Sequence, residues 1–383
     1  MMHVTRFSLC SASICLLLSG LGCSERSPSE STIRKLNIQV SGRLERGSIL
    51  ALALEDASGA PAVGHPLWIS RPAGAIARVG ADSIRLLVAG PVEIEASGDA
   101  ISARVDVVVA VPPTIVFDLA QRDGSRDIYR VDLDGSSLTR LTNSPSDDIS
   151  PSSADGRVIF VSYRDGEGDL YSVPLSGGGS ERRLTHSVVA ETSPTLSTDG
   201  SRLAYVSFVS GVARIWIASG DATSASPVSD VLASSNTVYA SPSWSPTGDR
   251  LAFVSTTNGN AHIFTIAPTG GVAEELAVSA GADLDPAWSP NGRFVAFASD
   301  RNDESRTNLF IVDVNTGLVR QVSNSSERQG EPAWLPDGRL VFTTWIGNAS
   351  QLRWLDPDSP EVLHEIDVGV GMPRHPKGVM SGS

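Results

Sequence analysis

The stretch DPAWSPNGRFVAFASDRN, residues 285–302, places two prolines beside an Asn-Gly turn and follows the turn with a run of apolar residues. Related stretches recur as SPSSADGRVIF, SPTLSTDGSRLAYV, SPSWSPTGDRLAFV and EPAWLPDGRLVF. Spacings of 44, 48, 44 and 46 residues separate their turn glycines, which are Gly156, Gly200, Gly248, Gly292 and Gly338. A period of this length, built from short strands, predicts a β-propeller.

Every repeat has the same order of parts: a short proline-containing strand, a glycine turn, an apolar strand, a third strand with an aromatic residue, and a fourth strand. The apolar strands are centred on Phe117, Phe160, Tyr205, Phe253, Phe297 and Phe342. The third strands carry Tyr129, Tyr171, Trp216, Phe264, Phe310 and Trp354. A sheet covered on both faces by its neighbours needs a continuously apolar middle strand, so we expect six blades.

The two ends of the repeat region are complementary. The first copy, residues 115–142, lacks the proline-containing strand, and GMPRHPKG, residues 371–378, is a degraded version of that strand after the sixth copy. We therefore expect the end of the chain to complete the first blade and to close the ring.

These features resemble the TolB family of six-bladed propellers. The resemblance rests on the P-x-W-S-P-[DN]-G signature and on the third-strand motifs at residues 127–129, 169–171 and 308–310. It covers residues 114–383 and implies a six-bladed TolB-like propeller there. The same scaffold carries unrelated activities, so the fold does not imply one function.

Residues 36–112 form a separate predicted unit with six strand-like runs, LNIQV, SILALALED, PLWIS, SIRLLV, VEIEA and ISARVDVVVAV. The last run alternates apolar and polar residues, the period of a half-buried strand. A short all-β unit of this kind predicts a β-sandwich. It resembles the bacterial immunoglobulin-like domains and differs from the α/β domain that precedes the propeller in TolB, which argues against a direct role in the Tol system.

The first 35 residues have the features of an export signal and a tether. Residues 1–22 contain one arginine and a short apolar core, which favours a signal peptide. The segment SGLGC resembles a lipobox, so Cys23 is the predicted lipidation site; ordinary secretory cleavage nearby is the alternative. Residues 23–35 are polar and suit a flexible tether. We expect an exported protein of the cell envelope, periplasmic or anchored at the outer membrane, with the lipid as its only membrane contact.

Composition narrows the possible ligands. The chain has 30 Lys+Arg against 43 Asp+Glu, and Lys35 and Lys377 are its only lysines. Because phosphate binding needs clustered cations, we do not expect a nucleic-acid partner. Beyond Cys23 there is no cysteine, and the histidines lack metal-ligand spacing. We expect no metal and no cofactor.

The sequence also lacks a hydrolase motif and a complete calcium-binding loop. The G-x-S-x-G elbow of the hydrolases that accompany related propellers is absent. The acidic turns at residues 132–135 and 300–304 lack the full spacing of a calcium loop, so solvated turns are the better interpretation.

The candidate ligand-binding residues precede the prolines of the innermost strands. Three positions before a proline stand Asp148, Glu191, Tyr239, Asp283 and Gln329, and one position before stand Asp285 and Glu331. Innermost strands line the central channel, so we expect these residues to meet at one mouth and to focus a negative potential. As loop carboxylates they should contribute little to the blade core. Ordinary surface charge is the alternative interpretation.

The sequence as a whole favours a binding protein whose partner is a protein or peptide, basic if the acidic mouth selects it. The alternative is a carbohydrate- or peptide-processing enzyme with its active site in the channel. A purely structural surface module is a third possibility.

Overall fold

The computed structural model describes residues 37–55, 61, 67–98, 101–228, 237–256 and 259–379. The predicted signal peptide, Cys23 and the tether lie outside these residues. All regular elements in the described part are β-strands, so the all-β prediction is confirmed. None of the described residues belongs to a helix long and apolar enough to cross a membrane. The chain divides into two compact units, Met1–Pro112 and Pro113–Ser383.

The N-terminal unit is a two-sheet sandwich. Its strands are β1 (Asn37–Ser41), β2 (Ile49–Glu55), β3 (Leu67–Arg71), β4 (Ile76–Gly80), β5 (Ser83–Leu86), β6 (Gly90–Gly98) and β7 (Ile101–Val109). One sheet has the order β1-β2-β5-β4 and the other β3-β6-β7. This is the strand order of a constant-type immunoglobulin sandwich.

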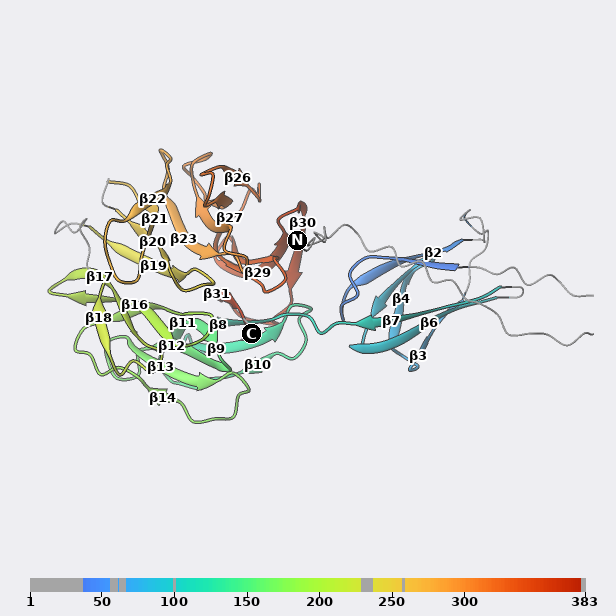
Figure 1. The fold of residues 1–383 in the computed structure, drawn as a ribbon. Helices are drawn as coiled ribbons and strands as arrows, with labels where there is room; N and C mark the ends of the chain where they lie inside the picture. Colours follow the sequence, from blue (N-terminus) through green and yellow to red (C-terminus); the bar gives the residue numbers. More distant parts are fainter. Residues whose placement is uncertain are drawn as a thin grey trace, which may run out of the picture. The chain divides into compact units, whose positions relative to one another are not determined.

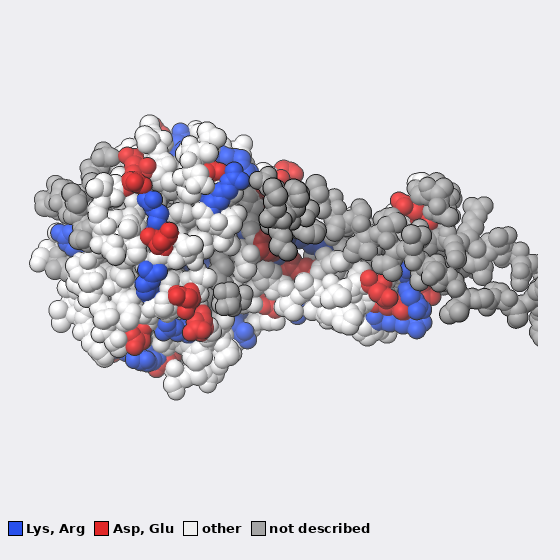
Figure 2. Space-filling view, in the orientation of Figure 1, with Lys and Arg blue, Asp and Glu red and all other residues white. Residues whose placement is uncertain are grey.

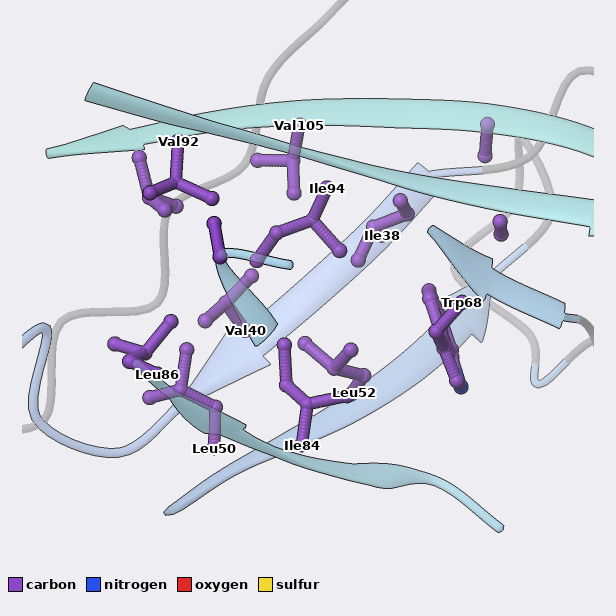
Figure 3. Close-up of a cluster of buried hydrophobic side chains, with 14 of the residues drawn as sticks. Ile38, Val40, Leu50, Leu52, Trp68, Ile84, Leu86, Val92, Ile94 and Val105 are labelled. Carbon is purple, nitrogen blue, oxygen red and sulfur yellow. The ribbon is translucent and has the colours of Figure 1, made fainter. Parts of the chain in front are cut away.

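The core of the sandwich lies between the two sheets (Figure 3). Leu50, Leu52 and Ile84 from one sheet face Ile94 and Val105 from the other, and all are buried. Trp68 lies on the third strand, as in immunoglobulin domains, and its indole N–H donates to the carbonyl of Ala81 at 3.2 Å. The alternation predicted for the last strand is confirmed from residue 103 to residue 109.

The sequence missed one strand of the sandwich, β4. Its residues, IARVG, are partly or fully exposed along the whole strand. Ile76 packs partly buried against the core, but one such residue gives the edge strand no hydrophobic period to detect.

The C-terminal unit is a propeller of six four-stranded sheets within the described residues (Figure 1). The first three blades consist of β31 (Pro373–Gly378), β8 (Thr114–Ala120), β9 (Arg126–Asp132) and β10 (Thr139–Arg140); β11 (Asp148–Ala154), β12 (Arg157–Ser162), β13 (Asp169–Pro174) and β14 (Arg182–Arg183); and β15 (Glu191–Leu196), β16 (Arg202–Val209), β17 (Val212–Ser219) and β18 (Ala225–Pro227).

The other three blades follow in chain order. They consist of β19 (Tyr239–Trp244), β20 (Leu251–Ser255), β21 (His262–Ile266) and β22 (Glu274–Ala277); β23 (Asp283–Trp288), β24 (Phe294–Ser299), β25 (Asn308–Asp313) and β26 (Val319–Gln321); and β27 (Arg328–Trp334), β28 (Leu340–Ile346), β29 (Ala349–Asp356) and β30 (Ser359–Ile366).

Ring closure occurs as the sequence predicts. The last strand, β31, pairs antiparallel with β8, with Pro373 opposite Leu119 and Gly378 opposite Ile115. In Figure 1 the red end of the chain therefore lies beside the green start of the propeller. The first blade is built from both ends of the repeat region.

The predicted aromatic residues form the centres of the blades. The six second-strand aromatics are at most 4% exposed. In blades one to five each lies directly opposite the aromatic residue of the third strand, as Phe297 lies opposite Phe310. The sixth blade is shifted by one position, because Phe342 lies opposite Arg353 and Trp354 lies opposite Val341.

Two of the three tryptophans of the P-x-W pattern, Trp244 and Trp334, join neighbouring blades through hydrogen bonds. The indole N–H of Trp244 donates to the carbonyl of Thr195 at 3.1 Å, and that of Trp334 donates to the carbonyl of Ala287 at 3.0 Å. Each bond connects an innermost strand to the innermost strand of the preceding blade. The P-x-W pattern is therefore a contact between repeats as well as a feature within one.

We predict that Gly378→Val weakens ring closure. A Cβ at Gly378 would lie 2.3 Å from the backbone oxygen of Trp334, so β31 or the sixth blade must move. We expect a loss of about 1 to 3 kcal/mol in the free energy of unfolding, measured by thermal and urea melts. The control is Gly369→Asn, where nothing lies within 4 Å and φ is 75°, a conformation that Asn tolerates. Equal melts for the two variants would mean that the last strand does not hold the ring.

Candidate functional site

A left-handed residue occurs at the same place in the innermost strand of each of the six blades. It immediately precedes the proline of that strand, and its φ lies between 49° and 54°. The six residues are Ser150, Ser193, Ser241, Asp285, Glu331 and His375. At each of them the pairing with the next strand shifts register, which defines a β-bulge. Positive φ is uncommon outside glycine, so its recurrence is a property of the blade.

The bulges surround a central channel. All six bulge residues line a cavity of about 70 Å³, the narrow chamber, together with Lys377. A second cavity of about 260 Å³, the wide chamber, is lined by the later residues of the innermost strands and by the turns that follow them. Lys377 lines both cavities, so the two chambers meet at this side chain.

The narrow chamber has two chemically different halves. Blades two to four contribute the hydroxyl groups of Ser150, Ser193 and Ser241. Blades five, six and one contribute titratable groups, those of Asp285, Glu331 and His375. A ligand on the axis would meet neutral donors on one side and charged groups on the other.

An ion-pair network ties the charged half together. The Nδ1 of His375 lies 2.6 Å from Asp118 Oδ1, and its Nε2 lies 3.3 Å from Glu331 Oε1. Glu331 also accepts from Arg374 at 2.6 Å and from the hydroxyl of Thr343 at 2.8 Å. These contacts connect the last strand, which carries His375 and Arg374, to the first and sixth blades.

The network favours the charged form of each member. Burial lowers the pKa of His375, but the carboxylates of Asp118 and Glu331 outweigh burial and leave that pKa raised. Burial raises the pKa of Asp118, but His375 and Arg126 outweigh it and leave it lowered. For Glu331 burial is likewise outweighed, by His375 and Arg374, and the pKa is lowered. At the centre of the network, two carboxylates thus favour the protonated form of the His375 imidazole.

Asp285 lies apart from this network. Its carboxylate accepts from the hydroxyl of Ser241 at 3.2 Å and from the backbone N–H of Glu331 at 3.3 Å. Burial raises its pKa, and the nearby Glu331 carboxylate raises it further.

The sequence selected Asp285 and Glu331 for this region and missed His375 and Lys377. A signal for both was present in the degraded repeat. If PRHPKG is aligned with DLDPAW on the prolines at 376 and 286, His375 takes the place of Asp285. Lys377 then takes the place of an alanine that lines the wide chamber in another blade, Ala287.

The five residues three positions before the prolines have a different environment. Asp148, Glu191, Tyr239, Asp283 and Gln329 are at most 4% exposed. Three of them donate a backbone hydrogen bond to the preceding blade, as Asp283 does to the carbonyl of Ala261 at 2.8 Å. They therefore belong to the contacts between consecutive blades.

Two of these carboxylates are paired with arginines of their own blades. Arg164 donates to both oxygens of Asp148, at 3.0 and 2.9 Å. Arg301 lies 2.9 Å from Asp283. Both aspartates are fully buried and lie in strands, so the expectation that they are loop carboxylates is wrong. They hold arginines that cover the aromatic blade centres, where Arg301 lies over Phe297.

The other three positions are also enclosed. Burial, with the neighbouring Asp169 adding to it, raises the pKa of Glu191 to about 7. Tyr239 packs between the third and fourth blades and its ring lies 5.8 Å from that of Phe253. The side-chain amide of Gln329 is buried and meets no hydrogen-bond partner in the described part of the chain.

Charge on the propeller surface is mixed. Figure 2 shows acidic and basic side chains beside one another on the face in view. Within the described residues no three His, Cys, Asp or Glu side chains are grouped so that they could hold a metal ion. The channel is therefore the candidate site, and its charge lies on the axis rather than in an acidic rim.

We predict that Glu191→Gln stabilises the protein at pH 8 and has little effect at pH 5. Between about pH 4.5 and 7 the folded state keeps a proton that the unfolded state has lost, so stability falls as the pH rises. Removing the charge should recover on the order of 2 kcal/mol at pH 8. Thermal melts at both pH values measure this, with exposed Glu361→Gln as the control. A loss of stability at pH 8 would show that Glu191 is ionised and satisfied in the fold.

Comparisons with known proteins agree with this architecture. A family model, the TolB beta propeller domain, matches residues 179–362. TolB from Acinetobacter baumannii is similar with a TM-score of 0.62 and 16% identity, over 91% of this chain and 82% of that one. A putative TolB from Agrobacterium tumefaciens (TM-score 0.54, 17% identity) and a chain of the nidogen/laminin complex (0.54, 14%) each match 70% of this chain, over 92% and 98% of theirs. No curated protein matches the sequence. The propeller is TolB-like.

Proposed function

We propose that this chain is an exported, lipid-anchored binding protein that uses its propeller to bind a protein or peptide in the cell envelope. The channel is the observation that carries the proposal. Its wide chamber is concave and lined mainly by apolar and hydroxyl side chains, and one charged group lies at its inner end. Sites with this balance are typical of ligand recognition.

The remaining parts of the chain complete the proposal. Residues 1–22 act as the signal peptide, Cys23 carries the lipid, and residues 23–35 are the tether. Residues 36–112 are a bacterial immunoglobulin-like domain between the anchor and the propeller. The protein would then work in the periplasm or at the outer membrane.

The charge expected of the partner depends on how the candidate carboxylates are paired. A basic partner was expected because five carboxylates were to meet at one mouth. Asp148 and Asp283 are neutralised by arginines, and Glu331 is held by Arg374 and His375. The proposal therefore keeps a protein or peptide partner and does not require it to be basic.

An enzyme is less well supported by the geometry. His375 is the histidine of the channel, and both of its ring nitrogens face carboxylates, Asp118 and Glu331. A general base needs a nitrogen that faces the substrate. This histidine is better explained as part of ring closure.

We predict that Cys23→Ser releases the protein from membranes. Cys23 is the cysteine that follows the lipobox-like segment, so no acyl chain can be attached without its thiol. Wild type should partition into detergent and the variant into water, while Cys15→Ser should behave as wild type. Equal partitioning of wild type and Cys23→Ser into water would contradict the lipid anchor.

We predict that Thr198→Trp blocks partner binding. Thr198 lines the wide chamber, where a large side chain would occupy the space of the ligand. The soluble form, residues 24–383, is used to capture partners from envelope extract. The control is Val272→Trp at an outer position that is 76% exposed. If Thr198→Trp captures the same partner as well as the control does, binding takes place on another surface.

A further inference from the structure

Lys377 is the unusual residue of the channel. It lies on the closing strand and lines both chambers. In the part of the chain that the structure describes, its ammonium group forms no hydrogen bond and no ion pair with any residue. A buried or partly buried cation is normally paired, because desolvating an unpaired charge is costly.

The two nearest carboxylates are already engaged. Glu331 is held by Arg374, His375 and Thr343. Asp285 accepts from Ser241 and from the backbone of Glu331. Both acids attract Lys377 at longer range, and neither forms an ion pair with it. The three N–H donors of the ammonium are left for another acceptor.

Lys377 is also the one charged side chain among the residues that line the wide chamber. The others are serine, threonine, tryptophan, proline, alanine, leucine and glycine. Two of these carry polar atoms that are buried and have no partner among the described residues, Ser153 Oγ and Trp288 Nε1. These two atoms are closed off from the chamber, so Lys377 is the charged group that the chamber presents to whatever occupies it.

We propose that the wide chamber binds a carboxylate at Lys377, and that this carboxylate is the C-terminal group of a peptide chain. The inference rests on the proposed function and names the chemistry of the partner. A carboxylate would accept two or more hydrogen bonds from the ammonium and neutralise its charge, and such charge-assisted hydrogen bonds are stronger than neutral ones.

The size of the channel favours a chain end. At about 260 Å³ the wide chamber falls just below the range of roughly 300 to 1,000 Å³ usual for small-molecule sites. Beyond Lys377 the channel contracts to the narrow chamber of about 70 Å³, which the prolines and bulge residues of the innermost strands surround. A peptide can enter this space by its end, and its last carboxylate then reaches Lys377.

The electrostatics support the same geometry. Burial lowers the pKa of Lys377, and the facing groups Asp285 and Glu331 only partly restore it. The other charged group on the narrow chamber is His375, which its own carboxylates hold. A bound anion stabilises the ammonium form, so affinity should fall as the pH rises through this lowered pKa.

The composition allows a direct measurement, because Lys35 and Lys377 are the only lysines. A soluble form, residues 24–383, labelled with ¹³C-lysine gives two Cε signals, and Lys377→Met assigns them. The probes are acetyl-Ala-Ala-Ala with a free carboxylate, the same peptide with a C-terminal amide, and sodium acetate. We expect the free-acid peptide to shift the Lys377 signal and leave that of Lys35 in place. The amide should bind at least ten-fold more weakly.

Each outcome decides a different point. Equal affinities for acetate and the free-acid peptide would show that the site takes small carboxylates and overturn the peptide terminus. An unmoved Lys377 signal with every probe would overturn the proposal. If Thr198→Trp abolishes partner capture while Lys377→Met does not, the binding function stands and the carboxylate inference fails. If neither variant affects capture, both the channel function and this inference fail.

Discussion

The pairing of β31 with β8 is the constraint on which the propeller depends. Five blades are continuous in sequence, but the first exists only when the last strand returns to it. That strand, PRHPKG, has little apolar surface to bury. Besides the backbone pairing with β8, its side chains make ionic contacts, from His375 to Asp118 and from Arg374 to Glu331. Ring closure therefore combines a backbone ladder with ion pairs, and the pair of His375 and Asp118 joins residues 257 positions apart in the chain.

The same six residues also give the channel its chemistry. His375 occupies the bulge position that serines hold in three other blades, and Lys377 extends into the region where the two chambers meet. A strand recruited from the end of the chain was free to differ from the repeat. The polar groups that close the ring are consequently those that a ligand on the axis would meet.

Most of the fold could be predicted from the sequence, because it depends on periods and spacings. The glycine turns, the aromatic blade centres and the returning strand all repeat or complement one another locally. The predictions failed where the sequence carries no repeated signal. The strand β4 has no buried apolar face, and the sixth blade pairs Phe342 with Arg353 instead of an aromatic residue. One-residue shifts of register cannot be read from spacing alone.

The candidate site was harder to predict, since burial and pairing decide what a carboxylate does. Asp148 stands three positions before the proline of its innermost strand, and Asp285 stands one position before the proline of another. Asp148 meets Arg164, which lies beyond the next strand, whereas Asp285 sits on a bulge and faces the axis. The spacing to the proline separates the two positions in sequence, but only the three-dimensional pairing gives the role of each.

The division of the channel into halves has a consequence for recognition. A symmetric ring of six serines would bind a ligand in six equivalent orientations. Asp285, Glu331 and His375 replace serine in three adjacent blades and remove that equivalence. A ligand with one charged end and one neutral face then has a single favourable orientation, because each charge is fixed by its neighbours and cannot turn away. Divergence of the repeats is therefore what allows a nearly symmetric scaffold to bind an asymmetric partner.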